Sequence, residues 1–393
     1  MKQQLRNRKR DVKIESIYFI IMWIITLALY VLMPSDSALL PLLYYGVHIV
    51  TIGSFIITLS RSRWVNRFNA GRLMCMFVII VAVVCSGIAT TELITFKTHV
   101  LAAAGFAEML MAIYIVDSLD YTPKMTRFLY RINMIISVVF IYLSFTSYAY
   151  DSEIIGSLNL GYSNPNVAAI YILLNLAVLI TYFDKNEKLF VKLIIFASGA
   201  YLFYLLYLTD SRMCFISALV ILVYRFFTPK WQIPKWTILP MQLIPLVFMF
   251  WYVYLYQQNG GVTTDFMGKD FFSGRESHFV LMFEFLQENL LLGDFGVHYF
   301  KNAHNGPLAV LLNTGIVGYS FYTLFVTRTL YKYHGDIKTY RQKIALVVIY
   351  AIFIHGSAEA PMFIGGAMYS ILVATIYWIL KGDGVNDHQA TNQ

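Results

Sequence analysis

Two arginines are the first candidates for chemistry in a chain that has few charged residues. Arg212 stands at the start of a long apolar stretch, and Arg275 stands at the start of an amphipathic one. The first turn of a helix offers free N–H groups and partial positive charge, which favour anions. Two guanidinium groups at two helix starts would suit a diphosphate, because arginine binds phosphate by two-point hydrogen bonding. The alternative is that Arg212 and Arg275 form surface salt bridges with their neighbours Asp210 and Glu276.

A histidine near a predicted helix start could supply a general base. His304 and Asn305 come just before Pro307, a residue typical of the first turn of a helix. Neutral imidazole near pH 7 is a competent base for a substrate hydroxyl. A histidine in a loop is more often a solvated surface residue, and this alternative stays open. His278 and His298 are spare candidates, but they show no metal-ligand spacing, so we expect neither a metal nor a cofactor.

Glu359, Asn305 and Asn164 are candidates for binding a substrate. Glu359 ends an apolar stretch, where it could neutralise an arginine or position a substrate hydroxyl; alternatively it faces water at a helix end. Asn164 precedes Pro165, a pair that mainly indicates the cap and first turn of a helix. The predicted location of Asn164 at the outer face leaves a sugar-binding role open.

The elements that must position these residues are apolar helices. The chain has 393 residues, 58% of them hydrophobic and 13% charged, where soluble domains carry about a quarter charged residues. Its apolar residues form blocks of about 20, the length of a membrane-spanning helix. This composition excludes a soluble enzyme, a disordered chain and a fibrous protein. We predict an all-α polytopic bundle, one integral membrane domain over residues 1–393, with about twelve spans: 17–33, 39–59, 73–90, 99–116, 129–148, 165–183, 189–207, 212–227, 237–257, 307–327, 344–359 and 363–380.

The distribution of positive charge predicts the orientation of the bundle. If the basic N-terminus is cytoplasmic, the cytoplasmic segments hold 25 of the 30 Lys and Arg residues. This asymmetry follows the positive-inside rule and predicts that both termini are cytoplasmic in a multi-pass plasma-membrane protein. The candidate residues then lie at the extracytoplasmic face. The net charge of +8 is explained by this topology, so we expect no nucleic-acid partner.

One long loop separates the ninth and tenth predicted spans. Residues 258–306 are rich in phenylalanine, and long irregular loops in compact proteins are usually functional or disordered. Ser273 with Glu276 resembles a capping box, and Gly293 is a plausible helix end. The apolar residues between them recur at helical spacing and predict an amphipathic helix along the outer surface: Phe279, Met282, Phe283, Leu286 and Leu290. We expect this extracytoplasmic loop to form part of the active site.

The order of these motifs resembles a known family. The chain is similar to the O-antigen ligase and Wzy-type polysaccharide polymerase superfamily over roughly residues 160–360. The motifs that carry the resemblance are Gly161-Tyr162-Ser163-Asn164-Pro165-Asn166, Asp210-Ser211-Arg212, Ser273-Gly274-Arg275, Gly293-Asp294-Phe295-Gly296, Ala303-His304-Asn305 and Glu359. Each motif alone is weak, whereas the ordered set with its large outer loop is fairly specific.

The resemblance implies a fold and an activity. Members of this superfamily resemble GT-C glycosyltransferases that act outside the membrane on undecaprenyl-diphosphate-linked glycans, without a metal and with inversion at the anomeric carbon. By this resemblance, Arg212 and Arg275 hold the lipid diphosphate, and His304 activates the acceptor hydroxyl. Met213-Cys214 departs from the small residues that are commoner after the first arginine, which affects local packing rather than the role of Arg212.

Among the activities, we favour a polymerase of capsule, exopolysaccharide or O-antigen repeat units in a bacterial plasma membrane. The candidate partners are the lipid-linked glycan, the bilayer, a chain-length regulator and a flippase. A ligase that transfers finished glycan to another acceptor is the alternative within the family. A flippase for the same lipid is the alternative from another class. A flippase should carry charges at mid-membrane depth, and Glu108 is the one charged residue well inside a predicted span.

Overall fold

A computed structural model gives the fold of the protein. Its described residues are helical apart from short turns and one hairpin, in which β1 (Asp265–Phe266) pairs antiparallel with β2 (Lys269–Asp270). The structure describes residues 14–33, 38–61, 67–88, 107–150, 156–162, 164–182, 188–227, 231–260, 265–266, 269–270, 276–293, 304–360 and 367–382.

Helices occupy the predicted apolar ranges. The long helices are α2 (Ile14–Leu32), α3 (Leu40–Arg61), α4 (Arg67–Ile88), a helical stretch at 107–118, α6 (Pro123–Leu143), α7 (Pro165–Tyr182), α8 (Leu189–Leu208), α9 (Arg212–Phe227), α10 (Ile238–Gln258), α12 (Gly306–Gly335), α13 (Tyr340–His355) and α15 (Ala367–Lys381). Short 3-10 turns form η2 (Ser147–Tyr150) and η3 (Lys235–Thr237). Among the described residues, seven helices are long and apolar enough to cross a membrane. The prediction of a helical membrane protein is confirmed, while the number of twelve spans stays a prediction.

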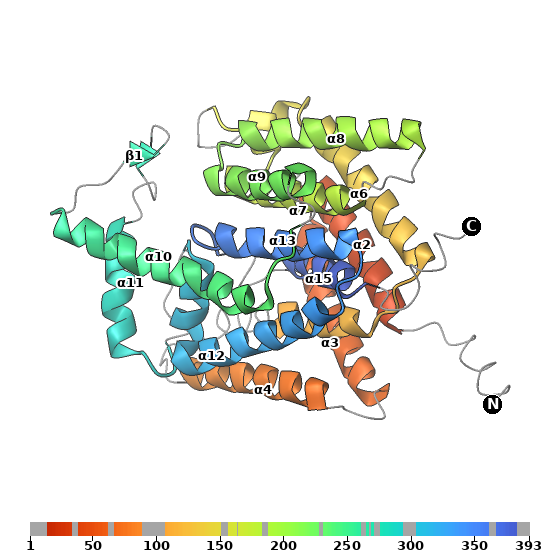
Figure 1. Ribbon diagram of the computed structural model, residues 1–393. Coiled ribbons are helices and arrows are strands. Elements are labelled where there is room, and N and C mark those ends of the chain that lie inside the picture. The colour runs from red at the N-terminus through yellow and green to blue at the C-terminus, as the bar shows by residue number, and fades with distance from the viewer. Residues whose placement is uncertain are drawn as a thin grey trace.

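Helix α7 forms the centre of one half of the bundle. Its sequence is apolar on every side, and a helix of this kind is stable only when other helices surround it. It packs against α6, α8, α9 and α13. Figure 1 shows α8 at one edge of the molecule, over α9 and α7. Helix α7 is therefore a buried scaffold, and its first residues are held by the rest of the bundle.

The first and last long helices lie side by side in opposite directions. Trp23 Nε1 in α2 donates to Thr375 Oγ1 in α15 over 3.2 Å. One turn earlier in α2, the rings of Phe19 and Trp378 have their centroids 5.2 Å apart. The start of α2 and the end of α15 therefore lie at the same end of the bundle.

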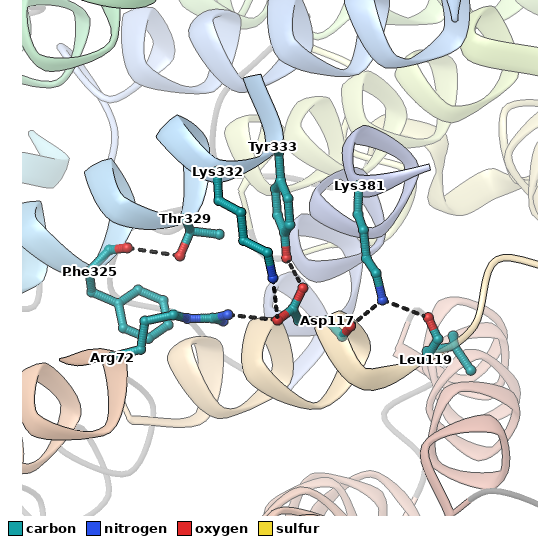
Figure 2. A network of polar contacts seen from close by, with 8 residues as sticks. All are labelled: Arg72, Asp117, Leu119, Phe325, Thr329, Lys332, Tyr333 and Lys381. Atoms are coloured by element: carbon teal, nitrogen blue, oxygen red, sulfur yellow. Dashed lines mark hydrogen bonds and ion pairs between the residues drawn. The ribbon is translucent and has the colours of Figure 1, made fainter. Parts of the chain in front are cut away.

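A buried carboxylate ties four elements together at that end (Figure 2). Asp117, at the end of the helical stretch 107–118, contacts Arg72 Nη1 of α4 at 2.9 Å and Lys332 Nζ of α12 at 3.9 Å. Tyr333 Oη of α12 donates to its other oxygen, and Lys381 Nζ of α15 donates to its backbone carbonyl. Because Lys332 lies near the last turn of α12, this network is far from the start of that helix.

Helix α12 is interrupted within its predicted span. Gly315 has φ 61° and ψ −173°, which breaks the run of helical hydrogen bonds. The N–H groups of Ile316 and Val317 instead donate to Leu290 O at 2.9 Å and Leu291 O at 3.3 Å. The long loop is therefore docked on the break in α12, and its carbonyl groups satisfy donors that the helix leaves open.

Two glycines allow this close approach. A Cβ at Gly315 would overlap the backbone of Leu291, and a Cβ at Gly293 would overlap the backbone of Leu312. Both glycines also have positive φ, a conformation that L-residues other than glycine rarely adopt. The docking therefore requires glycine on each side of the contact.

The predicted amphipathic helix is present as α11 (Glu276–Glu288). Its residues Phe279, Met282 and Leu286 are buried, and the ring of Phe283 lies 4.3 Å from that of Phe250 in α10. Figure 1 shows α11 between the ends of α10 and α12. Two details of the prediction were wrong, because α11 ends at Glu288 rather than near Gly293, and Leu290 lies beyond it and is exposed. Ser273 lies outside the described residues.

Candidate functional site

Three helix starts meet at the end of the bundle opposite the Asp117 network. The starts belong to α7, α9 and α12, and the segment that follows α13 lies among them. The chain enters each start through a non-glycine residue with positive φ: Leu160 at 55°, Asp210 at 57° and His304 at 46°. Backbone of this kind is sparsely populated, and it clusters at functional sites where the surrounding structure holds it. The strained positions therefore point to this end of the molecule.

His304 and Glu359 form the central contact of the site. His304 Nδ1 lies 3.4 Å from Glu359 Oε2, and the two side chains are 28% and 10% exposed. Asn166 Nδ2 donates to the other carboxylate oxygen, Oε1, at 2.9 Å. When Nδ1 carries the proton that faces Glu359, Nε2 is left as the basic nitrogen of the ring. The partial exposure of His304 leaves the ring accessible to a ligand.

The start of α12 fixes the backbone of His304. Asn305 caps α12, with its Oδ1 accepting from Leu308 N at 2.9 Å. Its Nδ2 donates to Ser357 O at 3.1 Å and to Pro245 O at 3.3 Å. Asn305 is fully buried, and these contacts are all to protein backbone. Its placement favours a role in holding His304 against the Glu359 segment over the substrate-binding role expected from the sequence.

The start of α7 positions Asn166. Asn164 Oδ1 accepts from Asn166 N at 2.8 Å, and Pro165 begins the helix, as the sequence predicted. This cap turns the side chain of Asn166 toward Glu359. Asn164 is partly exposed at the same helix start, so the predicted sugar-binding role remains open for it. Asn166 was not chosen from the sequence, although it is part of the same motif.

Glu359 lies in a turn that continues α13. Its N–H donates to His355 O at 3.2 Å, and the imidazole of His355 is fully buried below it. Glu359 also lies near Cys214 in the first turn of α9 and near Tyr369 in α15. The carboxylate therefore faces residues from several helices.

Of the two predicted diphosphate ligands, the structure describes one. Arg212 is the first residue of α9 and is partly buried, in the first turn as predicted. Ser217 Oγ of α9 donates to Ala351 O of α13, and Tyr340 Oη of α13 donates to Arg225 O of α9, so the two helices run antiparallel. The start of α9 therefore lies near the end of α13, which leads to Glu359. Arg275 and His298 lie outside the described residues, as do the side chains of Glu276 and His278.

The structure adds one histidine–glutamate pair that the sequence did not predict. Glu108 Oε2 contacts His48 Nδ1 of α3 at 2.9 Å, and Thr51 Oγ1 donates to Glu108 Oε1 at 3.3 Å. Glu108 is buried, and His48 lies in the middle of its helix. A charge at this depth is costly and is a functional candidate by default. The pairing was not predictable, because His48 lies in an apolar run far from Glu108 in sequence.

The described residues contain no group of three or more His, Cys, Asp or Glu side chains that could hold a metal ion. No protein-family model, no curated protein and no solved structure matches this chain.

Proposed function

We propose that the protein is a glycosyltransferase that polymerises undecaprenyl-diphosphate-linked oligosaccharide repeat units at the outer face of a bacterial plasma membrane. The observation that carries the proposal is the chain of contacts Asn166–Glu359–His304, which lies beside the helix start that bears Arg212. An oriented histidine next to a helix-start arginine suits transfer of a sugar from a diphosphate to a hydroxyl. The ordered motifs support the same family of reactions.

In this mechanism His304 is the general base. Its Nε2 takes the proton of the acceptor hydroxyl as that oxygen forms a bond to the anomeric carbon of the donor sugar. The bond between the anomeric carbon and the diphosphate oxygen breaks, and its electron pair leaves with the lipid diphosphate. Glu359, 3.4 Å from Nδ1, stabilises the imidazolium that forms. Attack from the face opposite the leaving group gives inversion.

Arg212 stabilises the charge that develops on the leaving diphosphate, and Arg275 is proposed for the same role. The partial positive charge at the start of α9 adds to this stabilisation. Such preorganised electrostatics are usually the largest contribution to catalysis, and here they need no metal. The donor would enter sideways from the bilayer, with its diphosphate at the outer interface and its sugars beneath the loop that carries α11.

A flippase for the same lipid is the second candidate, because of one observation. The His48–Glu108 pair is an ionisable pair at mid-membrane depth, the kind of group that proton-coupled transporters use. The two proposals place the essential histidine at different positions. A ligase remains the alternative within the glycosyltransferase proposal, since it would use the same residues with another acceptor.

The test is a reconstitution with matched histidine variants. Purified protein in lipid vesicles is supplied with undecaprenyl-diphosphate repeat units, without metal or nucleotide, and the products are separated on a gel. We expect a ladder of lengthening glycans from the wild type and from His48→Gln, and no ladder from His304→Ala. Transport of the lipid that is lost in His48→Gln but kept in His304→Ala would overturn the proposal in favour of the flippase. Transfer only to an added acceptor would identify a ligase.

A further inference from the structure

An apolar groove lies on the outside of the bundle between α8 and α9. Its volume is about 240 Å³, and its floor is formed by Leu176 and Leu179 of α7. Helix α7 packs against both α8 and α9, which contact each other much less. Figure 1 shows these three helices together at one edge of the molecule. The groove is therefore a gap between two helices that share one buried neighbour.

The groove has a closed end and an open end. The connection between α8 and α9 is short, and near it Phe215 of α9 packs against Phe203 and Tyr207 of α8, with ring centroids 5.0 and 6.0 Å apart. Away from this connection, the groove is lined by Phe196 of α8 and Phe226 of α9, both exposed at the surface.

Two small residues of α8 create the space. Gly199 and Ala200 line the groove and leave it unfilled. A Cβ at Gly199 would meet only the Leu176 side chain, at 3.7 Å, which is ordinary van der Waals contact. The surrounding surface is apolar and exposed, and in a membrane protein such a surface faces hydrocarbon. A flexible acyl chain can fill a groove of this shape and recover the dispersion contacts that a void would lose.

One charged residue lines the groove, and its positive charge indicates that the lipid has an anionic headgroup. Arg225 lies in the last turn of α9, partly buried at the open end. Its guanidinium carbon is 4.3 Å from the ring centroid of Tyr340, and Tyr340 Oη donates to Arg225 O at 2.5 Å, so α13 holds this turn in place. Lys188 precedes α8 at the same end. The sequence predicts that this end is cytoplasmic.

We propose that the groove binds one anionic glycerophospholipid of the cytoplasmic leaflet. One acyl chain lies between α8 and α9 over Gly199, and the phosphate lies beside Arg225, whose planar donors suit a phosphate oxygen pair. The site is at the opposite end of the bundle from His304 and takes no part in glycan transfer. It would hold α8, the more exposed of the two helices, against the core.

The test reads lipid retention by mass and does not use activity. The protein is reconstituted in nanodiscs of equimolar phosphatidylglycerol and phosphatidylethanolamine, transferred to detergent, and analysed by native mass spectrometry. We expect one retained phosphatidylglycerol on the wild type and none on Gly199→Leu, whose side chain fills the groove. The matched control is Gly53→Leu in α3, where a Cβ has nothing within 4 Å, and it should keep the lipid.

A second variant tests the headgroup. Arg225→Gln should bind phosphatidylglycerol about tenfold more weakly, the effect of losing one charge-assisted hydrogen bond. It should also lose the preference for phosphatidylglycerol over phosphatidylethanolamine. Equal retention in Gly199→Leu and Gly53→Leu would overturn the proposal. So would equal amounts of the two lipids on the wild type, or displacement of the lipid by an added polyprenyl phosphate. A failure of glycan polymerisation would leave these results unaffected.

Discussion

Removing the charge of Asp117 should destabilise the protein more than removing its partner Arg72. Arg72 is fully buried, with its guanidinium carbon 4.9 Å from the Phe325 ring centroid, and Asp117 Oδ2 lies 2.9 Å from its Nη1. Asp117→Asn keeps the size of the side chain but takes this counter-charge from a buried cation. In Arg72→Met the carboxylate keeps Lys332 at 3.9 Å and the hydroxyl of Tyr333. The two single variants should therefore differ in how much they destabilise the folded protein.

The magnitudes follow from burial. Breaking a buried ion pair by removing one partner costs about 3–5 kcal/mol, so we expect about 3 kcal/mol for Asp117→Asn. For Arg72→Met we expect about 1–2 kcal/mol, because the carboxylate that remains still has a half-exposed lysine beside it. The double variant should lose no more than about 2 kcal/mol, since replacing a buried pair by uncharged groups is often close to neutral. The coupling would then be at least about 2–3 kcal/mol.

Thermal unfolding of the purified protein in detergent measures these differences. At about 2–4 °C per kcal/mol for large domains, Asp117→Asn should lower the midpoint by about 6–12 °C. The double variant should unfold at a higher temperature than Asp117→Asn. An Asp117→Asn midpoint equal to the wild type, or a double variant that loses the sum of both single effects, would refute the reasoning, because either result means that the two charges are not coupled.

The Asp117–Arg72 pair also predicts the direction in which folding stability changes with pH. Burial alone would raise the pKa of Asp117, but Arg72, Lys332 and Lys381 outweigh it and hold the pKa below its ordinary value. A carboxylate with a lowered pKa stabilises the folded state at pH values above its unfolded pKa of about 3.9, and this contribution is lost as pH falls through the folded pKa. The advantage of the wild type over Asp117→Asn should stay constant from pH 8 to pH 5 and shrink only below about pH 4.

Three further predictions concern the site and the helix break. Glu359→Gln should lower kcat about 10- to 100-fold in the glycan assay. The reason is that the charged form of the partly exposed His304 loses about 1–3 kcal/mol of stabilisation by the carboxylate. An unchanged kcat would remove Glu359 from the mechanism. Gly315→Ala should prevent most of the protein from folding, since its Cβ would overlap a backbone carbonyl of the docked loop. The control Gly335→Ala, with open space around it, should express normally. Equal yields of the two variants on size-exclusion chromatography would contradict the docking. Arg212→Lys should keep part of the activity at about tenfold lower kcat/KM for the lipid donor, because an ammonium lacks the two-pronged geometry, and full activity would argue against bidentate binding.

The helices were predictable because hydrocarbon imposes their length and composition. The predicted spans 165–183 and 189–207 agree with α7 and α8 to within one residue. Pro165 marks the start of the first apolar block, and charged residues separate it from the second. Helix α12 was predicted to end at 327, but it continues to Gly335. Its last turns are polar, and hydropathy marks where a helix leaves hydrocarbon rather than where its hydrogen bonds stop.

The site was predictable in its members but not in its contacts. Residue type and helix-start chemistry singled out His304, Glu359 and Arg212, because a titratable or charged side chain is rare in an apolar bundle. The contact between His304 and Glu359 joins positions 55 residues apart and depends on how α12 packs against the end of α13. Asn166 was missed because an asparagine at a helix start is usually a capping residue. Gly315 was missed because its conformation requires the docked loop.

The docking of residues 290–293 on α12 limits how the site can open. Withdrawing this segment would leave the amides of Ile316 and Val317 without their present acceptors, Leu290 O and Leu291 O. Each amide left unpaired would cost about 1–3 kcal/mol, so we expect the segment to stay docked on α12. Any motion of α11 must then take place while residues 290–293 stay in contact with α12. In the proposed reaction, a lipid donor would therefore enter between transmembrane helices, in the plane of the bilayer.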